Sequence, residues 1–345
     1  MRITVPQKEI RVFTISPRTL GLEKYWQELQ DTTTWSSNFN CTGILIFTGN
    51  DTYIEPWLVA QTVLEKTRNL SPLVAVNPVY MHPFTAAKMI SSFAHLYQRR
   101  VYLNMVTGTA VSHLEALGDS VPHDERYQRL QEYIQVVKAL LEASRPVTFH
   151  GRFYTTDHLQ LYSVFPKELL PEFVLAGQSP AARSVCDAVG AVGMHMLQSK
   201  LADAVVETRG IHFGIVTRPD DAAAWKAAER LFPPDSEGKD LLDYSMRNTD
   251  SSWKRRMRFE ADQPDAAASG YWLEPFRNSK ADCPYFVGSY TRIAELIEKL
   301  VRRGVDTFIL DIPATEEEYA HASEAFRLAE CQLRSSCEPA AALAS

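Results

Sequence analysis

Residues 73–108 read LVAVNPVYMHPFTAAKMISSFAHLYQRRVYLNMVTG, and this stretch decides the fold class. It begins with the apolar run Leu73–Val76 and ends near a second, largely apolar run, Val101–Val106. Between the two runs, apolar side chains recur at the three- and four-residue spacing of an amphipathic helix: Ala86, Met89, Ile90, Phe93 and Tyr97. Apolar strands joined through a helix indicate a parallel sheet that is covered by helices.

The same alternation of strand and helix continues along the chain. Strands are expected at residues 11–16, 43–47, 73–76, 101–106, 173–175, 193–197, 211–217 and 307–310. Eight such units fit a closed barrel better than an open sheet. The sequence therefore predicts an α/β fold, a single (β/α)8 TIM barrel with insertions over residues 1–335.

Two stretches interrupt this alternation. Residues 145–166 are interpreted as an excursion between the fourth helix and the fifth strand. Residues 232–285 contain prolines and charges and no clear strand, and a loop of this length is interpreted as a lid. The Ala-rich tail, residues 336–345, is predicted to be disordered.

Composition excludes several classes of partner. The 345-residue chain has a formal net charge of −6 and no basic stripe, so nucleic acid is not expected as a partner. No apolar run is long enough to span a membrane, and the N-terminus lacks the apolar core of a signal peptide. The five cysteines form no CxxC pair, which favours reduced thiols in the cytoplasm and no metal site.

In a (β/α)8 barrel the active site lies at the carboxyl ends of the strands. This rule selects the following residues: Ser16, residues 48–51 with Asp51 at their end, Asn77, Asn104, Thr107, Gln178, Ser179, His195 and Gln198. No GxGxxG follows the first strand and no P-loop is present, so dinucleotide and ATP binding are not supported.

Two short motifs suggest a phosphate site. Gly177-Gln178-Ser179-Pro180 precedes a helical stretch, and glycine followed by a serine hydroxyl at a helix N-terminus favours an anion. An ordinary helix cap at Ser179 would also explain this motif. His123 and Tyr127, four residues apart, lie on one face of the next helix upstream and could donate to the same anion. The alternative is an exposed first turn in which acids suit the helix dipole.

Several motifs, taken in order, resemble the bacterial-luciferase-like flavin monooxygenases, nearest the alkanesulfonate monooxygenase branch. The resemblance covers about residues 10–330, and its motifs are residues 75–78, 83–89, 99–108, 123–127, 149–154, 286–289 and 304–309. It implies FMN in the reduced form FMNH2, delivered by a separate NAD(P)H:flavin reductase. It also implies dioxygen as co-substrate, activated as a peroxyflavin to oxidise a small organic molecule.

The resemblance also assigns residues. Tyr127 and Ser179, with Gln178 beside them, would hold the flavin phosphate. Asn104 and Thr107 would contact the flavin ring or the ribityl chain, with His123 close by. A homodimer or homotetramer is expected by analogy, with helices 55–68 and 83–97 offering apolar surface.

The substrate site is less defined. His195, Asp51 and Tyr53 are candidates for catalysis on their placement alone. Gln198 is a candidate for substrate binding, and Arg277 could attract an anionic substrate, although a solvated basic face would also explain Arg277.

The chain departs from the sulfonate enzymes around the substrate. Asp51-Thr52-Tyr53 replaces their cysteine, Gln198 their tryptophan, and His212 and Gly214 their arginine and histidine. A rebuilt pocket suggests an enzyme of specialised metabolism acting by hydroxylation, C–S cleavage or Baeyer–Villiger oxidation. Two alternatives stay open: hydride transfer with a deazaflavin coenzyme on the same fold, and a non-catalytic flavin-binding barrel.

Overall fold

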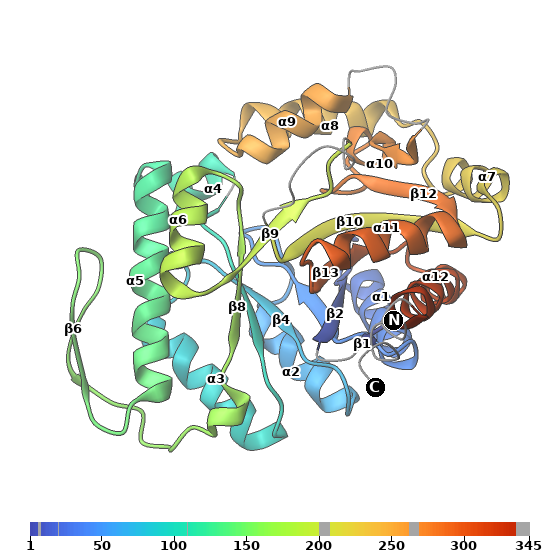
Figure 1. Ribbon diagram of the computed structural model, residues 1–345. Coiled ribbons are helices and arrows are strands. Elements are labelled where there is room, and N and C mark those ends of the chain that lie inside the picture. Colours follow the sequence, from blue (N-terminus) through green and yellow to red (C-terminus); the bar gives the residue numbers. More distant parts are fainter. Residues whose placement is uncertain (6–7, 20, 109, 200–207, 262–268, 336–345) are drawn as a thin grey trace, which may run out of the picture. The chain divides into compact units, whose positions relative to one another are not determined.

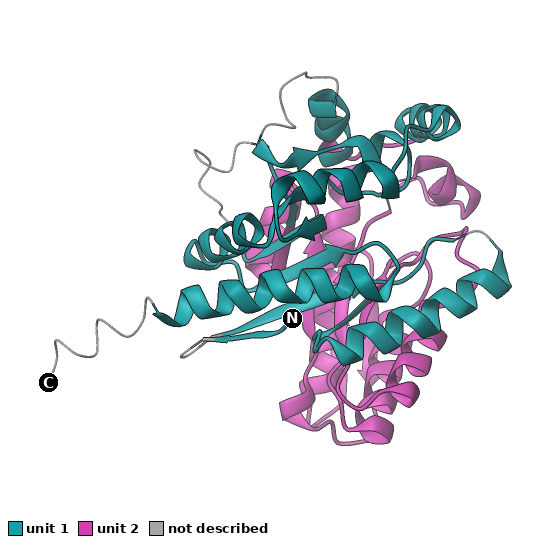
Figure 2. Cartoon of the chain, turned by 90° about the vertical axis from the view of Figure 1, so that its right-hand side faces the viewer, with its two compact units in different colours: residues 1–44, 195–247, 253–345 teal, residues 45–194, 248–252 magenta. Residues whose placement is uncertain are grey.

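The computed structural model describes all residues except 6–7, 20, 109, 200–207, 262–268 and 336–345. The tail for which disorder was predicted lies outside the described residues. The described chain forms two compact units, coloured separately in Figure 2. Unit 1 comprises residues 1–44, 195–247 and 253–345, and unit 2 comprises residues 45–194 and 248–252.

Unit 2 is built on parallel strands that are buried along their length. They are β4 (Leu73–Val76), β5 (Tyr102–Met105) and β8 (Glu172–Ala176), with β3 (Gly43–Ile46) and β9 (Val192–Met196) at the chain boundaries of the unit. Neighbours pair in register, as Leu73 with Tyr102 and Leu103 with Phe173. All four residues of β4 and of β5 are buried, which is why these strands read as continuous apolar runs.

Helices follow these strands (Figure 1), and all but the short α4 were expected from the sequence. They are α2 (Pro56–Lys66), α3 (Pro83–Tyr97), α4 (Val111–Ala116), α5 (His123–Glu142) and α6 (Pro180–Val189). Pro56, Pro83 and Pro180 each stand in the first turn of a helix, where proline needs no hydrogen-bond acceptor for an N–H it lacks. The three prolines therefore fix where the helices begin.

Unit 1 holds the remaining strands. They are β1 (Ile3–Val5), β2 (Lys8–Ile15), β10 (Gly210–Arg218), β11 (Tyr271–Trp272), β12 (Tyr285–Ser289) and β13 (Thr307–Asp311). Strand β13 pairs in parallel with both β2 and β10. Its helices are α1 (Leu22–Asn38), α7 (Asp221–Leu231), α8 (Ser236–Arg247), α9 (Ser252–Ala261), α10 (Glu274–Arg277), α11 (Tyr290–Arg302) and α12 (Glu316–Ser335).

The predicted fold class is confirmed. In chain order, the eight parallel strands β2, β3, β4, β5, β8, β9, β10 and β13 with their helices form a (β/α)8 barrel with insertions. Each coincides with an expected strand to within a few residues. The sequence did not predict β1, which pairs antiparallel with β2. It also did not predict that β12 pairs with the second half of β10, from Gly214 to Arg218.

The two excursions have structure of their own. Residues 145–166 contain a two-stranded hairpin, β6 (Val147–His150) and β7 (Thr155–Leu159), followed by a short 3-10 helix, Lys167–Leu169. The stretch 232–285 contains α8, α9, β11 and α10. Helices α8 and α9 were missed because they are polar overall and each buries only two residues, so few apolar positions mark them in the sequence.

Candidate functional site

Three hydroxyl groups of unit 2 gather at the carboxyl ends of β5 and β8. Tyr127 lies in the first turns of α5, Thr107 follows β5, and Ser179 precedes α6. The Tyr127 side chain is buried, and its hydroxyl donates to the carbonyl of Ala176 over 3.5 Å. Burial raises the pKa of Tyr127, and hydrogen bonds with Thr107 and Ser179 oppose that shift. The structure therefore brings together three residues that the sequence assigned to one cofactor.

Gly177 lets the backbone before α6 pack closely against one of these hydroxyls. Its φ of +145° is a conformation that residues with a side chain rarely adopt. A Cβ atom at this position would overlap the Tyr127 hydroxyl and lie 3.0 Å from the Cβ of Ala182. Only a glycine can therefore bring the backbone this close to Tyr127.

Ser179 also caps α6, which was the alternative interpretation from sequence. Its Oγ accepts a hydrogen bond from the Ala182 N–H over 3.2 Å. The two roles are compatible, since a hydroxyl that accepts one bond still has a proton to donate. A helix N-terminus with two neighbouring hydroxyls and a glycine in front of it suits a phosphate. The residues present therefore fit the phosphate end of FMN.

Asn104 supplies a different kind of group. It belongs to the fully buried strand β5, and its Oδ1 has no hydrogen-bond partner among the residues that the structure describes. A buried acceptor without a partner is unusual in a folded protein. An N–H of a flavin ring would satisfy it. Gln178, beside Ser179, is half-buried.

His123 opens α5 and packs edge-on against Tyr127, with ring centroids 5.2 Å apart. Its Nδ1 lies 2.8 Å from the Asp124 carboxylate, and about a third of its side chain is exposed. The expectation that His123 and Tyr127 share one helix face is confirmed. The acidic first turn, Asp124 and Glu125, is also present, so this helix start combines both sequence interpretations.

Sequence reasoning missed Arg126, which lies between the two predicted residues His123 and Tyr127. Its guanidinium is almost fully buried, donates to the Gly108 carbonyl over 3.3 Å and pairs with Asp250. The segment 248–252 is thereby joined to unit 2, and an isolated bridge between Ala110 and Thr249 adds to this link. The sequence could have pointed to Arg126, because Arg126 lies within the motif 123–127 that resembles the family.

The proposed catalytic and substrate-binding residues come from both units. Tyr53 and Asp51 lie in the exposed loop after β3, and half of the Tyr53 side chain is accessible. His195 lies on β9 and Gln198 just after it, both half-buried in unit 1. Arg277 ends α10, where it pairs with Glu274 at 3.6 Å and donates to the Ala261 carbonyl. The contact with Ala261 joins α10 to the end of α9.

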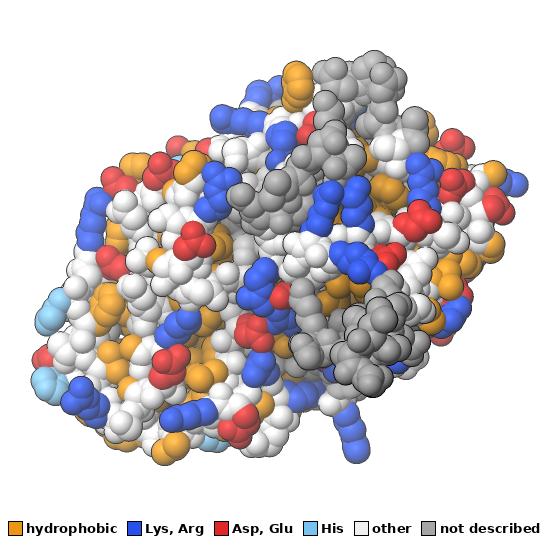
Figure 3. Space-filling model, in the orientation of Figure 1, with side chains coloured by type: hydrophobic (Ala, Val, Ile, Leu, Met, Phe, Trp, Pro, Cys, Tyr) orange, Lys and Arg blue, Asp and Glu red, His pale blue; other side chains and the backbone are white. Residues whose placement is uncertain are grey.

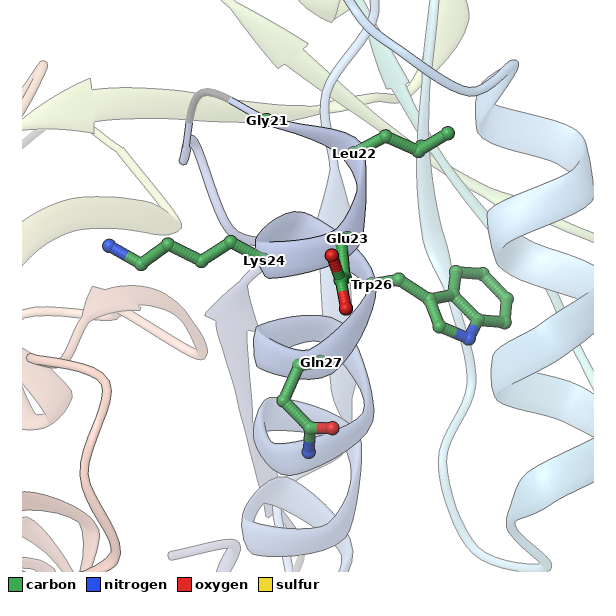
Figure 4. A pocket seen from close by; sticks show the side chains of 6 residues that line it. All are labelled: Gly21, Leu22, Glu23, Lys24, Trp26 and Gln27. Carbon is green, nitrogen blue, oxygen red and sulfur yellow. The ribbon is translucent and has the colours of Figure 1, made fainter.

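A surface pocket of unit 1 lies apart from the predicted site residues in sequence. Six residues at the start of α1, from Gly21 to Gln27, line a pocket shown in Figure 4, and none of them belongs to the predicted site. Within the described ranges, no three histidine, cysteine, aspartate or glutamate residues come together as metal ligands. No described helix is both long and apolar enough to cross a membrane.

Comparison with known proteins identifies the family. The model of the luciferase-like monooxygenases matches residues 32–307. A 4-(gamma-L-glutamylamino)butanoyl-(BtrI acyl-carrier protein) monooxygenase, BtrO, from Niallia circulans is 30% identical over 299 residues, covering 84% of this chain and 87% of that protein.

Solved structures show the same fold at low identity. EDTA monooxygenase from Chelativorans sp. BNC1 superimposes with a TM-score of 0.70 at 14% identity, covering 94% of each chain. The oxygenating constituent of 3,6-diketocamphane monooxygenase from Pseudomonas putida, in complex with FMN, gives 0.66 at 14% identity, covering 92% of this chain and 96% of that one. Family match, curated relative and fold agree: the chain belongs to the luciferase-like monooxygenase family and is a flavin-dependent monooxygenase.

Proposed function

We propose that this protein is the oxygenase of a two-component system, using FMNH2 from a separate NAD(P)H:flavin reductase and O2 to oxidise a small organic substrate. The observation that carries the proposal is the cradle in unit 2, in which Gly177 lets the Tyr127 hydroxyl pack against the backbone just before α6, within hydrogen-bonding reach of Thr107 and Ser179. We further propose a cytoplasmic homodimer or homotetramer, with a single barrel domain over residues 1–335.

Each residue of the cradle is proposed to bind a different part of FMN. Tyr127 and Ser179 would donate hydroxyl protons to the FMN phosphate, with Gln178 and His123 beside them. Thr107 would contact the ribityl chain, and the Asn104 Oδ1 would accept from the flavin ring. When bound, reduced FMN supplies the electrons that activate dioxygen.

Residues outside the cradle would bind the substrate and exclude water from the reacting groups. His195, Asp51 and Tyr53 are the side chains proposed to hold or move a proton at the substrate, and Gln198 and Arg277 would contact it. The insertion 232–285 is proposed as a lid that excludes water from the reacting groups.

The substrate is proposed to be an acyl group carried as a thioester, as in specialised metabolism. The support is the relative from Niallia circulans, a monooxygenase that acts on an acyl group of a carrier protein. Hydroxylation of the acyl chain is therefore favoured over C–S cleavage and Baeyer–Villiger oxidation. Membership in a monooxygenase family favours oxygen activation over deazaflavin hydride transfer or a non-catalytic barrel.

The test measures flavin binding first. Tyr127→Phe and Ser179→Ala each remove one hydroxyl, and each should weaken FMN binding about tenfold, because a hydrogen bond to a charged group is worth about 1.5 kcal/mol or more. Riboflavin, which lacks the phosphate, should bind the parent and both variants alike. Tyr53→Phe is the matched control and should bind FMN as the parent does.

The second part of the test measures the reaction. Anaerobic FMNH2 and the protein, exposed to oxygen with an acyl thioester, should yield an oxidised product. Unchanged FMN affinity in both hydroxyl variants would show that the phosphate binds elsewhere. FMN binding without any substrate-dependent product would favour the non-catalytic barrel.

A further inference from the structure

Unit 1 carries a group of charged side chains that are not part of the proposed flavin cradle. Arg18, in the loop after β2, lies between two carboxylates, with Nη1 3.5 Å from Asp311 Oδ2 and Nη2 3.8 Å from Asp282 Oδ2. Asp311 is the last residue of β13, so the group lies at the carboxyl ends of two barrel strands. In this fold those ends carry the active site.

The two carboxylates differ in their surroundings. The Asp311 side chain is 17% exposed, and the Cys283 thiol lies 3.8 Å from its Oδ2. Burial raises the pKa of Asp311, and Arg18 opposes that shift. The Asp282 side chain is 53% exposed. The positive charges of Arg18 and Lys254 lower the pKa of Asp282 and outweigh the opposing effect of desolvation by its neighbours.

His212 faces the same group from β10. In the parallel ladder His212 pairs with Ile309 and Gly214 with Asp311, which puts His212 and Asp311 on one face of the sheet. The adjacent Phe308 points the other way, onto Phe326 of α12, with ring centroids 6.0 Å apart. His212 and Asp311 therefore face away from α12, toward the interior of the barrel.

The His212 side chain has an open hydrogen-bonding position. The residue is 6% exposed, and its Nε2 has no partner in the part of the chain that the structure describes. Burial, with the positive charge of Arg18, lowers the pKa of His212 to about 3, so the imidazole is neutral near pH 7. A neutral ring with a buried, unpartnered nitrogen can bind a polar ligand group without adding charge.

We propose that Arg18, Asp311 and Asp282 bind the zwitterionic α-amino-acid end of the substrate, with His212 Nε2 completing its hydrogen bonds. Arg18 would bind the ligand carboxylate, and the two aspartates would bind its ammonium group. The Arg18 contacts, at 3.5 Å to Asp311 and 3.8 Å to Asp282, lie at or beyond the long limit of a hydrogen bond. A ligand with both charges can therefore exchange partners with them while Arg18 and the carboxylates keep opposite charges beside them.

This inference rests on the proposed function and names the substrate class more closely. The relative from Niallia circulans acts on a 4-(gamma-L-glutamylamino)butanoyl group. A γ-linked glutamyl residue leaves its α-amino and α-carboxyl groups free, so its far end is a zwitterion. Two acids and one arginine match those two charges better than they match a purely anionic or purely cationic chain.

The experiment compares three N-acetylcysteamine thioesters. One carries the 4-(γ-L-glutamylamino)butanoyl group, the second lacks its α-amino group, and the third lacks its α-carboxylate. Isothermal titration gives each dissociation constant, and product formation with FMNH2 and oxygen gives each kcat/KM. The parent should bind the first about tenfold or more tightly than either analogue.

The variants separate the two charges. Arg18→Met should abolish the preference over the analogue without the carboxylate, and Arg18→Lys should restore part of it. Asp311→Asn should reduce the preference over the analogue without the amine. FMN affinity should stay at the parent value in all three, because the cradle residues are unchanged. The matched control is Glu9→Gln, which breaks an exposed unit 1 ion pair with Arg2 and should leave every ratio unchanged.

Each outcome decides one idea. Equal binding of the three thioesters by the parent, or no binding of any, would overturn the inference. So would folded Arg18→Met and Asp311→Asn proteins that keep the parent preferences, which would make the cluster purely structural. Selective binding without FMNH2-dependent product would keep this inference and overturn the proposed oxidation.

Discussion

At the scale of the residue, His212 links the stability of this fold to pH. It is buried on β10, and burial lowers its pKa from 6.5 to about 3, with Arg18 adding to the shift and Asp282 opposing it. Between those two values the unfolded chain binds a proton that the folded chain does not bind. Stability from this residue is therefore fully present above pH 6.5 and is lost as the pH falls through the window below it.

We expect His212→Gln to flatten this dependence. In the parent, the free energy of unfolding should fall by up to about 1.4 kcal/mol per pH unit between pH 6 and pH 4 on account of this one group. The variant should lose that part of the slope. Urea unfolding at several pH values measures it, and His158→Gln is the control, because the side chain of His158 is 81% exposed. If the free energy of unfolding changes with pH equally in His212→Gln and the parent, this part of the pH dependence does not come from His212.

At the scale of the element, one carboxylate of α5 binds the turn of the β6–β7 hairpin. Glu132 of α5 accepts hydrogen bonds from three successive backbone N–H groups, those of Arg152 at 2.9 Å, Phe153 at 2.8 Å and Tyr154 at 3.1 Å. Figure 1 shows the hairpin beside α5. Contacts with α5, which no local sequence pattern reveals, thus help to order this excursion.

Removing that carboxylate should loosen the turn. Glu132→Ala leaves three N–H groups without their acceptor, and we expect a loss of about 2 to 3 kcal/mol in local stability. Hydrogen exchange at residues 152–154 should accelerate by about two orders of magnitude. Glu125→Ala is the control, since Glu125 pairs with the exposed guanidinium of Arg152 at 2.5 Å and such surface pairs contribute less than about 1 kcal/mol. Equal exchange in both variants would mean that the strands alone hold the hairpin.

At the scale of the whole molecule, the two-component proposal makes a prediction about the source of the electrons that reduce FMN. Acidic and basic side chains are interspersed on the face seen in Figure 3, without a large area of one charge. The sequence has no dinucleotide-binding fingerprint after its first strand. We therefore expect NAD(P)H and FMN alone to give no product with the purified protein. Adding an unrelated flavin reductase should restore product formation, because only free FMNH2 needs to be delivered. Product formation with NAD(P)H in the absence of a reductase would rule out the two-component scheme.

Local patterns predicted most of the barrel. The β-strands and the helices after them were found because apolar runs and three-to-four-residue periodicity are written directly into stretches such as 73–108. Strand β1 and helices α8 and α9 were missed. Strand β1 is only three residues long, and the two helices bury too little apolar surface to leave a clear pattern.

The candidate site was predicted in part. Tyr127, Ser179 and Thr107 could be named because each stands at a strand end or helix start, and the structure brings their hydroxyls together. The contact of Arg18 with Asp311 spans almost the entire chain, so no local pattern could show it.

The sequence by itself determined the barrel, most of the helix starts and the family of flavin monooxygenases, because these depend on the order and spacing of residues along the chain. Only the tertiary structure decided which polar groups share a space. It placed Gly177 against Tyr127, joined Asp250 to Arg126, and enclosed His212 beside Arg18 and Asp282. The physical reason is that burial and charge pairing arise between residues distant in sequence, after the strands have paired and excluded water.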